Sequence, residues 1–239
     1  IVAAGTYDEQ VVINKANLTL NGPNVAIDPG CSGVRPNAEA IITTTTGASN
    51  SIQSDGITLV IAANGITLDG FTVQNTSIDV NDVAILIGGN FVGDLAHPSD
   101  GNTILNCIIT GGRSNIYNWQ SSNNTIQKNR LIGAYETMIA IRDNSGSGAR
   151  NALNNSILNN CIDKAGVSNL GHGIAVGLTG GSAQDFSGTL IQNNTIKNSG
   201  VGTGLFRGID ANGANGTSGS MVKIYGNTLT DFSEGGIRI

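Results

Sequence analysis

The chain repeats one short pattern, and this repeat constrains the fold more than any other feature of the sequence. The pattern reads aliphatic-x-x-Asn-x-aliphatic, and successive copies lie 36, 22, 31, 34 and 33 residues apart. Its fourth position is occupied by Phe71, Cys107, Asn129, Asn160, Asn194 and Asn227. Self-similarity at a period of about 20 to 50 residues is typical of stacked supersecondary units, so the sequence predicts a solenoid.

A second, alternating segment follows most copies of the pattern. Examples are "MIAIRD" at 138–143, "GIAVGL" at 173–178 and "GIRI" at 236–239. Alternation with a period of two indicates short strands, and no segment of ten or more residues has the periodicity of a helix. Each repeat is therefore expected to contain at least two strands joined by polar turns. We predict an all-β fold, a single-stranded right-handed parallel β-helix (β-solenoid) of roughly eight coils.

The recurring asparagines have a physical reason in such a fold. A corner between two strands needs a residue that tolerates left-handed backbone angles, and Asn does so better than any residue except Gly. Side chains at equivalent corners would stack at the strand spacing of about 4.8 Å. Each carboxamide could then donate a hydrogen bond to one neighbouring coil and accept one from the other. We therefore expect an asparagine ladder of Asn129, Asn160, Asn194 and Asn227.

The composition limits both the number of domains and the kinds of partner. With 239 residues the chain has room for one sizeable core, and we expect a single domain over residues 1–239. No apolar run approaches the length of a membrane span. The formal net charge of −5, without a clustered basic face, argues against nucleic acid as a partner.

Two features of the sequence lie outside the repeat. Residues 28–56 are expected to form a loop excursion that contains one strand, at "EAIITTT" (39–45). Cys31, Cys107 and Cys161 have neither the spacing of metal ligands nor the even number of a disulfide framework. We therefore predict that the three cysteines are buried free thiols.

The segment "VAAGTYDEQVVINKANLTLNG" at 2–22 resembles the opening coils of secreted and cell-surface proteins of the pectate-lyase-like superfamily. The later repeats are similar to the short β-helix repeats of the same proteins, so the resemblance spans essentially all 239 residues. It implies the right-handed parallel β-helix and an extracellular or cell-surface location. It does not point to one enzyme family, because the superfamily includes lyases, hydrolases, esterases, epimerases, tailspikes and non-catalytic adhesins.

The two ends of the chain differ from the usual pattern of these proteins. Members of the superfamily usually have a helical cap over the first coil, which the sequence does not show, and the chain stops on the strand "IRI". We therefore expect a fragment or module of a longer protein. Its open ends would be covered by neighbouring copies or by flanking domains.

The stretch "GHGIAVG" at 171–177 is similar to a histidine-containing stretch of polygalacturonase-type hydrolases. Inverting hydrolysis needs a protonated acid and a separate base, so those enzymes depend on paired carboxylates in the preceding coils. In this chain the preceding coil offers only Glu136, and the coil before it, "SNIYNW", offers none. If the protein is an enzyme, a polysaccharide lyase is therefore favoured over a hydrolase.

Strand alternation places a group of charged residues on one outward sheet face. A lyase needs a base and cationic groups that neutralise the carboxylate of a uronate. The candidate catalytic residues on this face are Arg142, His172, Asp210 and Arg238. The candidate substrate-binding residues beside them are Tyr117, Trp119, Glu136, Asp143 and Arg207. The alternative is that these are solvated charges on a long sheet.

Calcium is the only cofactor that the sequence raises. Asp79, Asn81 and Asp82 in "SIDVND" offer hard oxygen ligands for this cation. Their spacing matches no specific calcium loop, and a polar turn is the alternative interpretation.

Two functions remain open from the sequence. The first is an extracellular or cell-surface module that binds, and in one version also processes, an acidic polysaccharide along the sheet face described above. The second is a structural or adhesive β-helix segment of a large surface protein or filament, without an active site. The arginines favour the first function, and the open ends favour the second.

Overall fold

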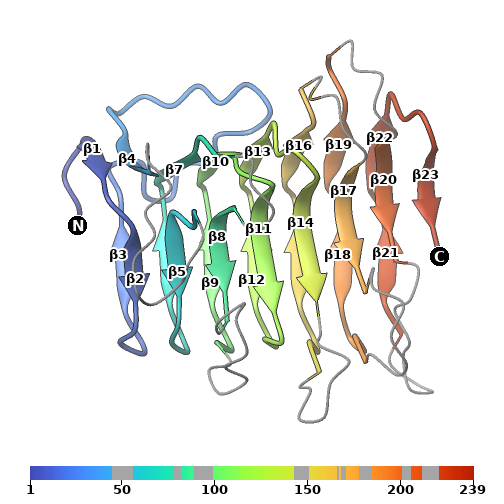
Figure 1. Cartoon of the computed structure of the whole chain (residues 1–239), viewed down its shortest axis with the longest axis horizontal. Helices are drawn as coiled ribbons and strands as arrows, with labels where there is room; N and C mark the ends of the chain where they lie inside the picture. The colour runs from blue at the N-terminus through green and yellow to red at the C-terminus, as the bar shows by residue number, and fades with distance from the viewer. Residues whose placement is uncertain are drawn as a thin grey trace.

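The chain winds into a parallel β-helix, seen from the side in a computed structural model (Figure 1). The structure describes residues 1–44, 56–77, 82–88, 99–142, 151–165, 167, 171–177, 185–200, 206–211 and 221–239. Within these residues every regular element is a β-strand. Each strand pairs in parallel with the strand three places later in the sequence, so one coil contributes one strand to each of three sheets. The predicted all-β parallel β-helix is confirmed, and its three strands per coil agree with the expected minimum of two.

The three sheets run along the whole described structure and are called sheets A, B and C. Sheet A contains β1 (Gly5–Asp8), β4 (Ala40–Thr44), β7 (Thr72–Asn75), β10 (Ile108–Gly111), β13 (Arg130–Ile132), β16 (Cys161–Asp163), β19 (Thr195–Lys197) and β22 (Thr228–Thr230). Sheet B contains β2 (Val11–Ile13), β5 (Leu59–Ile61), β8 (Val83–Ile87), β11 (Ser114–Trp119), β14 (Thr137–Arg142), β17 (Gly171–Val176), β20 (Phe206–Asp210) and β23 (Gly235–Arg238). Sheet C contains β3 (Thr19–Asn21), β6 (Thr67–Asp69), β9 (Thr103–Leu105), β12 (Thr125–Gln127), β15 (Ser156–Leu158), β18 (Leu190–Gln192) and β21 (Lys223–Tyr225).

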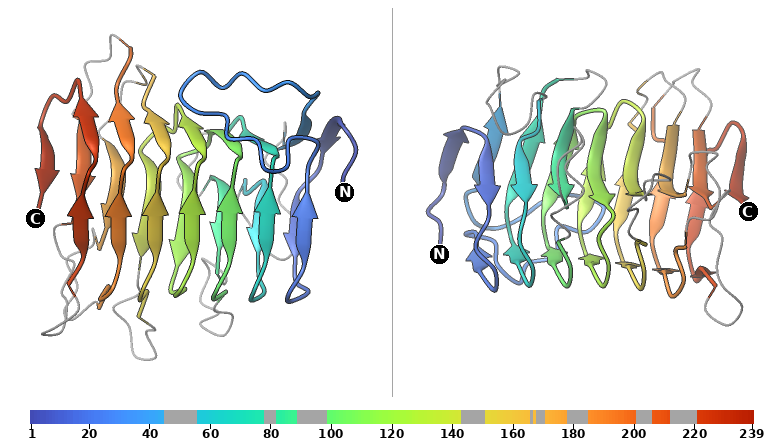
Figure 2. Two further views of the ribbon diagram at one scale, coloured as in Figure 1. Left: turned by 180° about the vertical axis from the view of Figure 1, so that it is seen from behind. Right: turned by 60° about the horizontal axis from the view of Figure 1, so that its bottom comes forward.

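The core consists of aliphatic rows in which like residues stack in register. In sheet C the stacked row is Leu20, Leu68, Ile104, Ile126, Ile157, Ile191 and Ile224. In sheet B the equivalent row is Leu59, Ile85, Ile116, Ile139, Ile174, Ile209 and Ile237. Because a strand has a period of two, the residues between these rows point outward. Figure 2 shows the same stack from behind and from below.

The corner between sheets C and A explains the sequence repeat. Each copy of the pattern consists of a sheet C strand, a two-residue corner and a sheet A strand, as in β9, Asn106-Cys107 and β10. The first corner residue has a left-handed backbone, with φ of 53° at Asn106, 54° at Asn159 and 56° at Asn193. Our prediction that the ladder asparagines adopt this conformation is therefore wrong. The preceding residue makes the turn, and the ladder residue faces inward.

The predicted asparagine ladder is confirmed. The Oδ1 atom of Asn160 accepts hydrogen bonds from the backbone N–H of Asn129 at 2.9 Å and from its Nδ2 at 3.1 Å. The same two contacts recur from Asn160 to Asn194, at 2.9 Å each, and from Asn194 to Asn227. The Nδ2 group of Asn160 also donates to the carbonyl of Ile126 at 2.9 Å. The ladder thus satisfies backbone groups at the corner that strand pairing leaves free.

A second ladder, which the sequence analysis missed, lies at the corner between sheets B and C. The backbone N–H of Asn102 donates to Oδ1 of Asn124 at 2.7 Å, and the N–H of Asn124 donates to Oδ1 of Asn155 at 3.0 Å. The preceding residues Asn123 and Asn154 again have left-handed backbones, with φ of 59° and 54°. The same physical solution therefore stabilises two of the three corners.

The excursion between β3 and β4 lies along several coils rather than within one. Residues 22–39, called the strap, run across the sheet A side of the β-helix as the long blue segment in Figure 1. The Asp69 carboxylate accepts hydrogen bonds from the backbone N–H of Ala26 at 3.1 and 3.2 Å. The fully buried side chain of Arg35 forms an ion pair with Glu39 and donates to the carbonyl of Asn106 at 2.6 Å. The strap is therefore fixed to coils far from its own ends.

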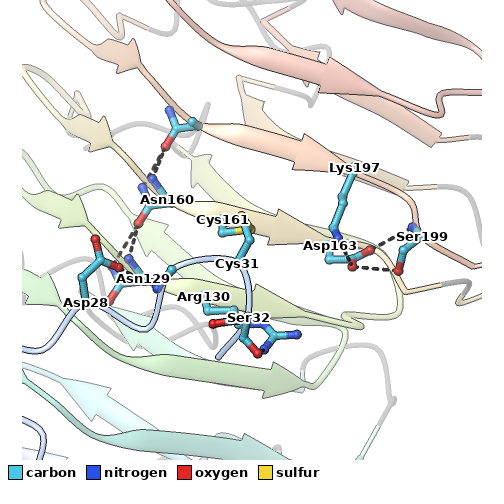
Figure 3. Close-up of a disulfide and its surroundings, with 12 residues drawn as sticks. Asp28, Cys31, Ser32, Asn129, Arg130, Asn160, Cys161, Asp163, Lys197 and Ser199 are labelled. Atoms are coloured by element: carbon cyan, nitrogen blue, oxygen red, sulfur yellow. Dashed lines mark hydrogen bonds and ion pairs between the residues drawn. A yellow bond between two sulfur atoms is a disulfide. The ribbon is translucent and has the colours of Figure 1, made fainter. Parts of the chain in front are cut away.

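A disulfide between Cys31 and Cys161 attaches the strap to β16, 130 residues away in the sequence (Figure 3). The prediction of three free thiols is wrong for these two cysteines. The path of the strap brings Cys31 beside β16, and local spacing carries no information about such a path. Cys107 is the free, buried thiol that we predicted, and burial raises its pKa to about 12. Cys107 is therefore a packing residue rather than a reactive one.

We expect the disulfide to stabilise the fold by restricting the unfolded chain. In the chain-entropy description a loop of this length contributes about 2 to 5 kcal/mol. The double variant Cys31→Ser, Cys161→Ser should therefore lower the free energy of unfolding by about this amount in urea titrations. Cys107→Ser in a separate variant serves as a control for the loss of a thiol. Unchanged stability in the double variant would contradict the stabilising role that we assign to the disulfide.

Removing one member of the ladder should cost more stability than removing an outward-facing histidine. Asn160→Ala leaves the corner groups of two neighbouring coils without partners, which costs about 2 to 4 kcal/mol. His172→Ala removes a side chain whose Nδ1 makes no hydrogen bond with the described chain. Thermal unfolding followed by circular dichroism should therefore show the larger loss of melting temperature for Asn160→Ala. The opposite order would mean that the ladder is not a main source of stability.

Candidate functional site

The outer face of sheet B brings together most of the charged residues that the sequence singled out. In register along this face lie Tyr117, Ala140, Ala175, Asp210 and Arg238. Arg142 lies two residues beyond Ala140 on β14, and His172 is in register with Arg207. Alternation accounts for Ala140, Ala175 and Asp210, because Ile139, Ile174 and Ile209 point into the core. His172 and Arg207 do not follow it, because they stand two residues before Ile174 and Ile209, and the intervening Gly173 and Gly208 face the interior residues Ile196 and Leu229. The face therefore places the candidate residues on five consecutive strands.

Asp210 is the centre of this group. Asp210 is 0% exposed, although it lies on the outer face of the sheet. Arg238 forms a two-pronged ion pair with it, in which Nε donates to Oδ1 at 3.1 Å and Nη2 contacts Oδ2. His172 Nδ1 and Arg207 Nη1 lie 3.4 and 3.5 Å from Oδ2. We call these four residues the Asp210 cluster. A buried carboxylate is favourable only with such partners.

His172 is held in its neutral form by its surroundings. Burial lowers the pKa of His172 to about 4. The Asp210 carboxylate opposes this shift, whereas the positive charges of Arg207, Arg142 and Arg238 reinforce it. At neutral pH the imidazole is therefore uncharged. Because Nδ1 faces a carboxylate, the proton of the neutral ring is best placed on Nδ1, which leaves the lone pair on Nε2.

Arg142 differs from the other arginines of the face. The residue is only 8% exposed, and its Nε and Nη1 are buried without a hydrogen-bond partner in the described part of the chain. Burial raises the pKa of Tyr117, and Arg142 opposes this rise through its charge and through hydrogen bonding to the phenol. The guanidinium therefore lies between Tyr117 on β11 and His172 on β17. A guanidinium with free donors matches a planar anion in charge and geometry, and an anion would reach Nε and Nη1 only after the groups that cover them move.

Tyr117 and Trp119 form an aromatic pair next to Arg142. Their ring centroids are 5.8 Å apart with an interplanar angle of 29°. Both rings pack against an apolar cluster on the outer face of the preceding strands, which includes Val60 and Leu86. Partly buried rings of this kind combine a flat apolar surface with a polar edge, a combination that suits stacking against sugar rings.

The remaining predicted residues are less closely associated with the Asp210 cluster. Glu136 precedes β14 and forms an ion pair with Arg113, while its backbone carbonyl accepts the N–H of His172 at 3.1 Å. Asp143 lies outside the described residues, as do Asp79 and Asn81 of the predicted calcium site. The third member of that site, Asp82, is buried. Within the described ranges no group of three or more His, Cys, Asp or Glu side chains could hold a metal ion.

Two residues near the cluster were missed by the sequence analysis. Glu234 forms an ion pair with Arg207 from the turn before β23. Lys164 is 0% exposed and lies between β16 and β17. The pairing Arg207–Glu234 could have been found from the register of the strands. Nothing in the pattern around Lys164 indicates burial.

The arrangement can bind an anion and accept a proton. Arg142 supplies unused donors, the aromatic pair supplies a stacking surface, and neutral His172 supplies a base. The interpretation as solvated surface charge is wrong for Asp210 and Arg142, since both are buried.

Among the described residues there is no helix that is long and apolar enough to cross a membrane.

Comparison with known proteins identifies the fold. No protein-family model matches the chain, and no curated protein matches its sequence. Two crystal structures of the pectin methylesterase from Aspergillus niger are similar over 99% of this chain and 79% of the enzyme. The deglycosylated form has 18% sequence identity and a TM-score of 0.49. The form with an N-acetylglucosamine stub has 19% identity and a TM-score of 0.50. This protein thus has a right-handed parallel β-helix fold like that of the enzyme.

Proposed function

We propose that this protein binds an acidic polysaccharide along the outer face of sheet B and that His172 acts on the bound chain as a base. The observation that carries the proposal is the buried guanidinium of Arg142, whose Nε and Nη1 have no partner in the described chain. A buried cation with free donors is costly unless an anion completes it. The carboxylate of a uronate has the charge and the planar geometry to do so.

The order of residues along the axis fits an extended polymer. A sugar chain that runs along the β-helix axis would pass the aromatic pair on β11, then Arg142 on β14, then His172 on β17. Stacking on Tyr117 and Trp119 would hold one ring, and Arg142 would hold the carboxylate of a neighbouring ring. His172 then lies next along the path, with Nε2 as the free lone pair.

The chemistry that these groups support best is β-elimination. The base removes the proton on the carbon next to the uronate carboxylate, and Arg142 stabilises the negative charge that develops on that group. The glycosidic oxygen on the adjacent carbon leaves with the bonding electrons and takes up a proton, and a carbon–carbon double bond remains. Glycoside hydrolysis would instead need two available carboxylates. Asp210 and Glu234 are both engaged by arginines.

The disulfide supports an extracellular or cell-surface location. Disulfides persist in oxidising compartments and are rare in the cytosol. Cys31 and Cys161 are joined between segments that are far apart in the sequence, so this bond secures the folded structure. The proposed location and the proposed polymeric substrate are consistent with each other.

A structural or adhesive role is the second candidate function. It is favoured by the exposed apolar residues of the last coil, where Tyr225 is 51% exposed and Ile237 is 48% exposed. A neighbouring copy or a flanking domain stacked on this coil would cover them. In that case the Asp210 cluster would serve stability alone, and no polysaccharide would bind.

We expect Arg142→Gln to weaken binding of oligogalacturonate by about tenfold or more, because a charged donor pair is worth about 1.5 to 3 kcal/mol. Lys223→Gln, an exposed position on sheet C, gives a matched control for the change in charge. Titration calorimetry with oligogalacturonate, its methyl ester and a neutral glucan measures the affinity. Equal affinities for the acid and the neutral glucan would exclude the acidic-polysaccharide proposal, and no binding at all would favour the structural role.

We expect the protein to release unsaturated products from polygalacturonate. The ultraviolet absorbance of these products measures the rate. His172→Gln should lower kcat at least about 100-fold and change KM less, because a general base acts in the transition state. The ratio kcat/KM should persist at pH 5 to 6 and fall as the pH drops through about 4, where His172 of the free protein gains a proton. Assays for reducing ends and for methanol detect hydrolysis of glycosidic bonds and of esters. Binding without unsaturated product would overturn the catalytic half of the proposal.

A further inference from the structure

Lys164 is an unusual residue for its position. It is completely buried, and its ammonium group donates to three consecutive carbonyl oxygens, those of Ala134 at 2.9 Å, Tyr135 at 2.6 Å and Glu136 at 3.1 Å. We call this arrangement the carbonyl clamp. An ammonium group has three donors, so the clamp uses all of them. Among the described residues no carboxylate forms an ion pair with Lys164, and burial lowers its pKa to about 8, which the Glu136 carboxylate opposes.

The carbonyl clamp is joined directly to the strand that carries His172. The carbonyl oxygen of Glu136 accepts one hydrogen bond from Lys164 and a second from the backbone N–H of His172, at 3.1 Å. Thr137, the next residue, is in register with His172. The position of the Glu136 peptide therefore sets where β17 begins. The Glu136 side chain is fixed separately, by its ion pair with Arg113.

Gly171 shows how closely β17 approaches the clamp. A Cβ atom at this position would lie 1.9 Å from the Glu136 carbonyl oxygen and 2.7 Å from Nζ of Lys164. Only a residue without a side chain allows the backbone to pass so near to the ammonium group. The glycine before His172 is thus explained first by the Glu136 carbonyl and then by the ammonium group that this carbonyl binds. Any displacement of the clamp is transmitted to the residue next to Gly171.

We propose that Lys164 is a positioning residue, which holds the carbonyls of residues 134–136 together and thereby keeps His172 Nδ1 opposite the Asp210 carboxylate. Three carbonyl oxygens that converge on one point repel one another unless a cation lies between them. Without the ammonium group this turn would open, and the N–H of His172 would lose its fixed acceptor. The imidazole would then be free to move out toward solvent. The inference rests on the proposed function only in naming His172 as the reacting group.

The titration of His172 tests the inference without any substrate. The chain has two histidines, so the ring signals of His172 in NMR spectra can be assigned by comparison with a His97→Gln variant. In the unaltered protein His172 should titrate near pH 4. In Lys164→Met we expect the midpoint to move at least one pH unit toward the ordinary value of about 6.5, because the ring becomes more hydrated. Lys164→Arg, which keeps a buried cation with several donors, should retain most of the low value.

Two further variants separate positioning from general loss of stability. Ile126→Val removes a buried methyl group in sheet C, so it should lower stability and leave the His172 midpoint unchanged. Gly171→Ala should raise the midpoint by pushing β17 away from the clamp. If Lys164→Met does not fold, Lys164→Gln replaces it, since an amide offers two of the three donors. An unchanged His172 midpoint in folded Lys164→Met or Lys164→Gln protein would overturn the inference, whether or not the protein binds polysaccharide.

Discussion

Stacking of equivalent residues at the strand spacing is the interaction on which the rest of this structure depends. Parallel pairing satisfies the backbone within each sheet, but it leaves the corner groups without partners. The asparagine ladder supplies those partners, since each carboxamide accepts from the preceding coil and donates both to that coil and to the next one. Because the ladder needs the same residue at the same corner, it also fixes the register of the strands on either side. The aliphatic rows then fill the interior without helices.

The same register creates the candidate site. When strands are stacked without slippage, outward residues of successive coils also lie opposite one another, whether or not their side chains are alike. Asp210 and Arg238 are paired in this way, and so are His172 and Arg207. The site thus consists of positions at which the outward residues of the repeat are replaced by charged ones. The ladder at one corner and the core inside the coil therefore determine the geometry of the site.

Residues that follow the repeat could be predicted from the sequence, whereas residues that depend on distant contacts could not. The ladder was visible because Asn160 and its equivalents recur in one local pattern. The outward placement of Asp210 followed from alternation, but its complete burial depends on what surrounds the sheet face. The Cys31–Cys161 bond depends on the path of the strap, which no periodicity describes. The burial of Lys164 could not be predicted, because its three acceptors come from another coil.

The charges around the Asp210 cluster favour both anion binding at Arg142 and a neutral, basic His172. Among the described residues of the face, Arg142, Arg207 and Arg238 are opposed by two carboxylates, those of Asp210 and Glu234. One positive charge is therefore left over next to His172, in a protein whose formal net charge is −5. This excess disfavours protonation of the imidazole, which keeps it available as a base. Burial is the main cause of the low pKa of His172, and the positive charges of the arginines add to it. The excess charge equally favours an anion beside Arg142, so a bound carboxylate would partly neutralise the contribution of these charges. The basicity of His172 should thus rise when an acidic ligand is bound, which is when a base is needed.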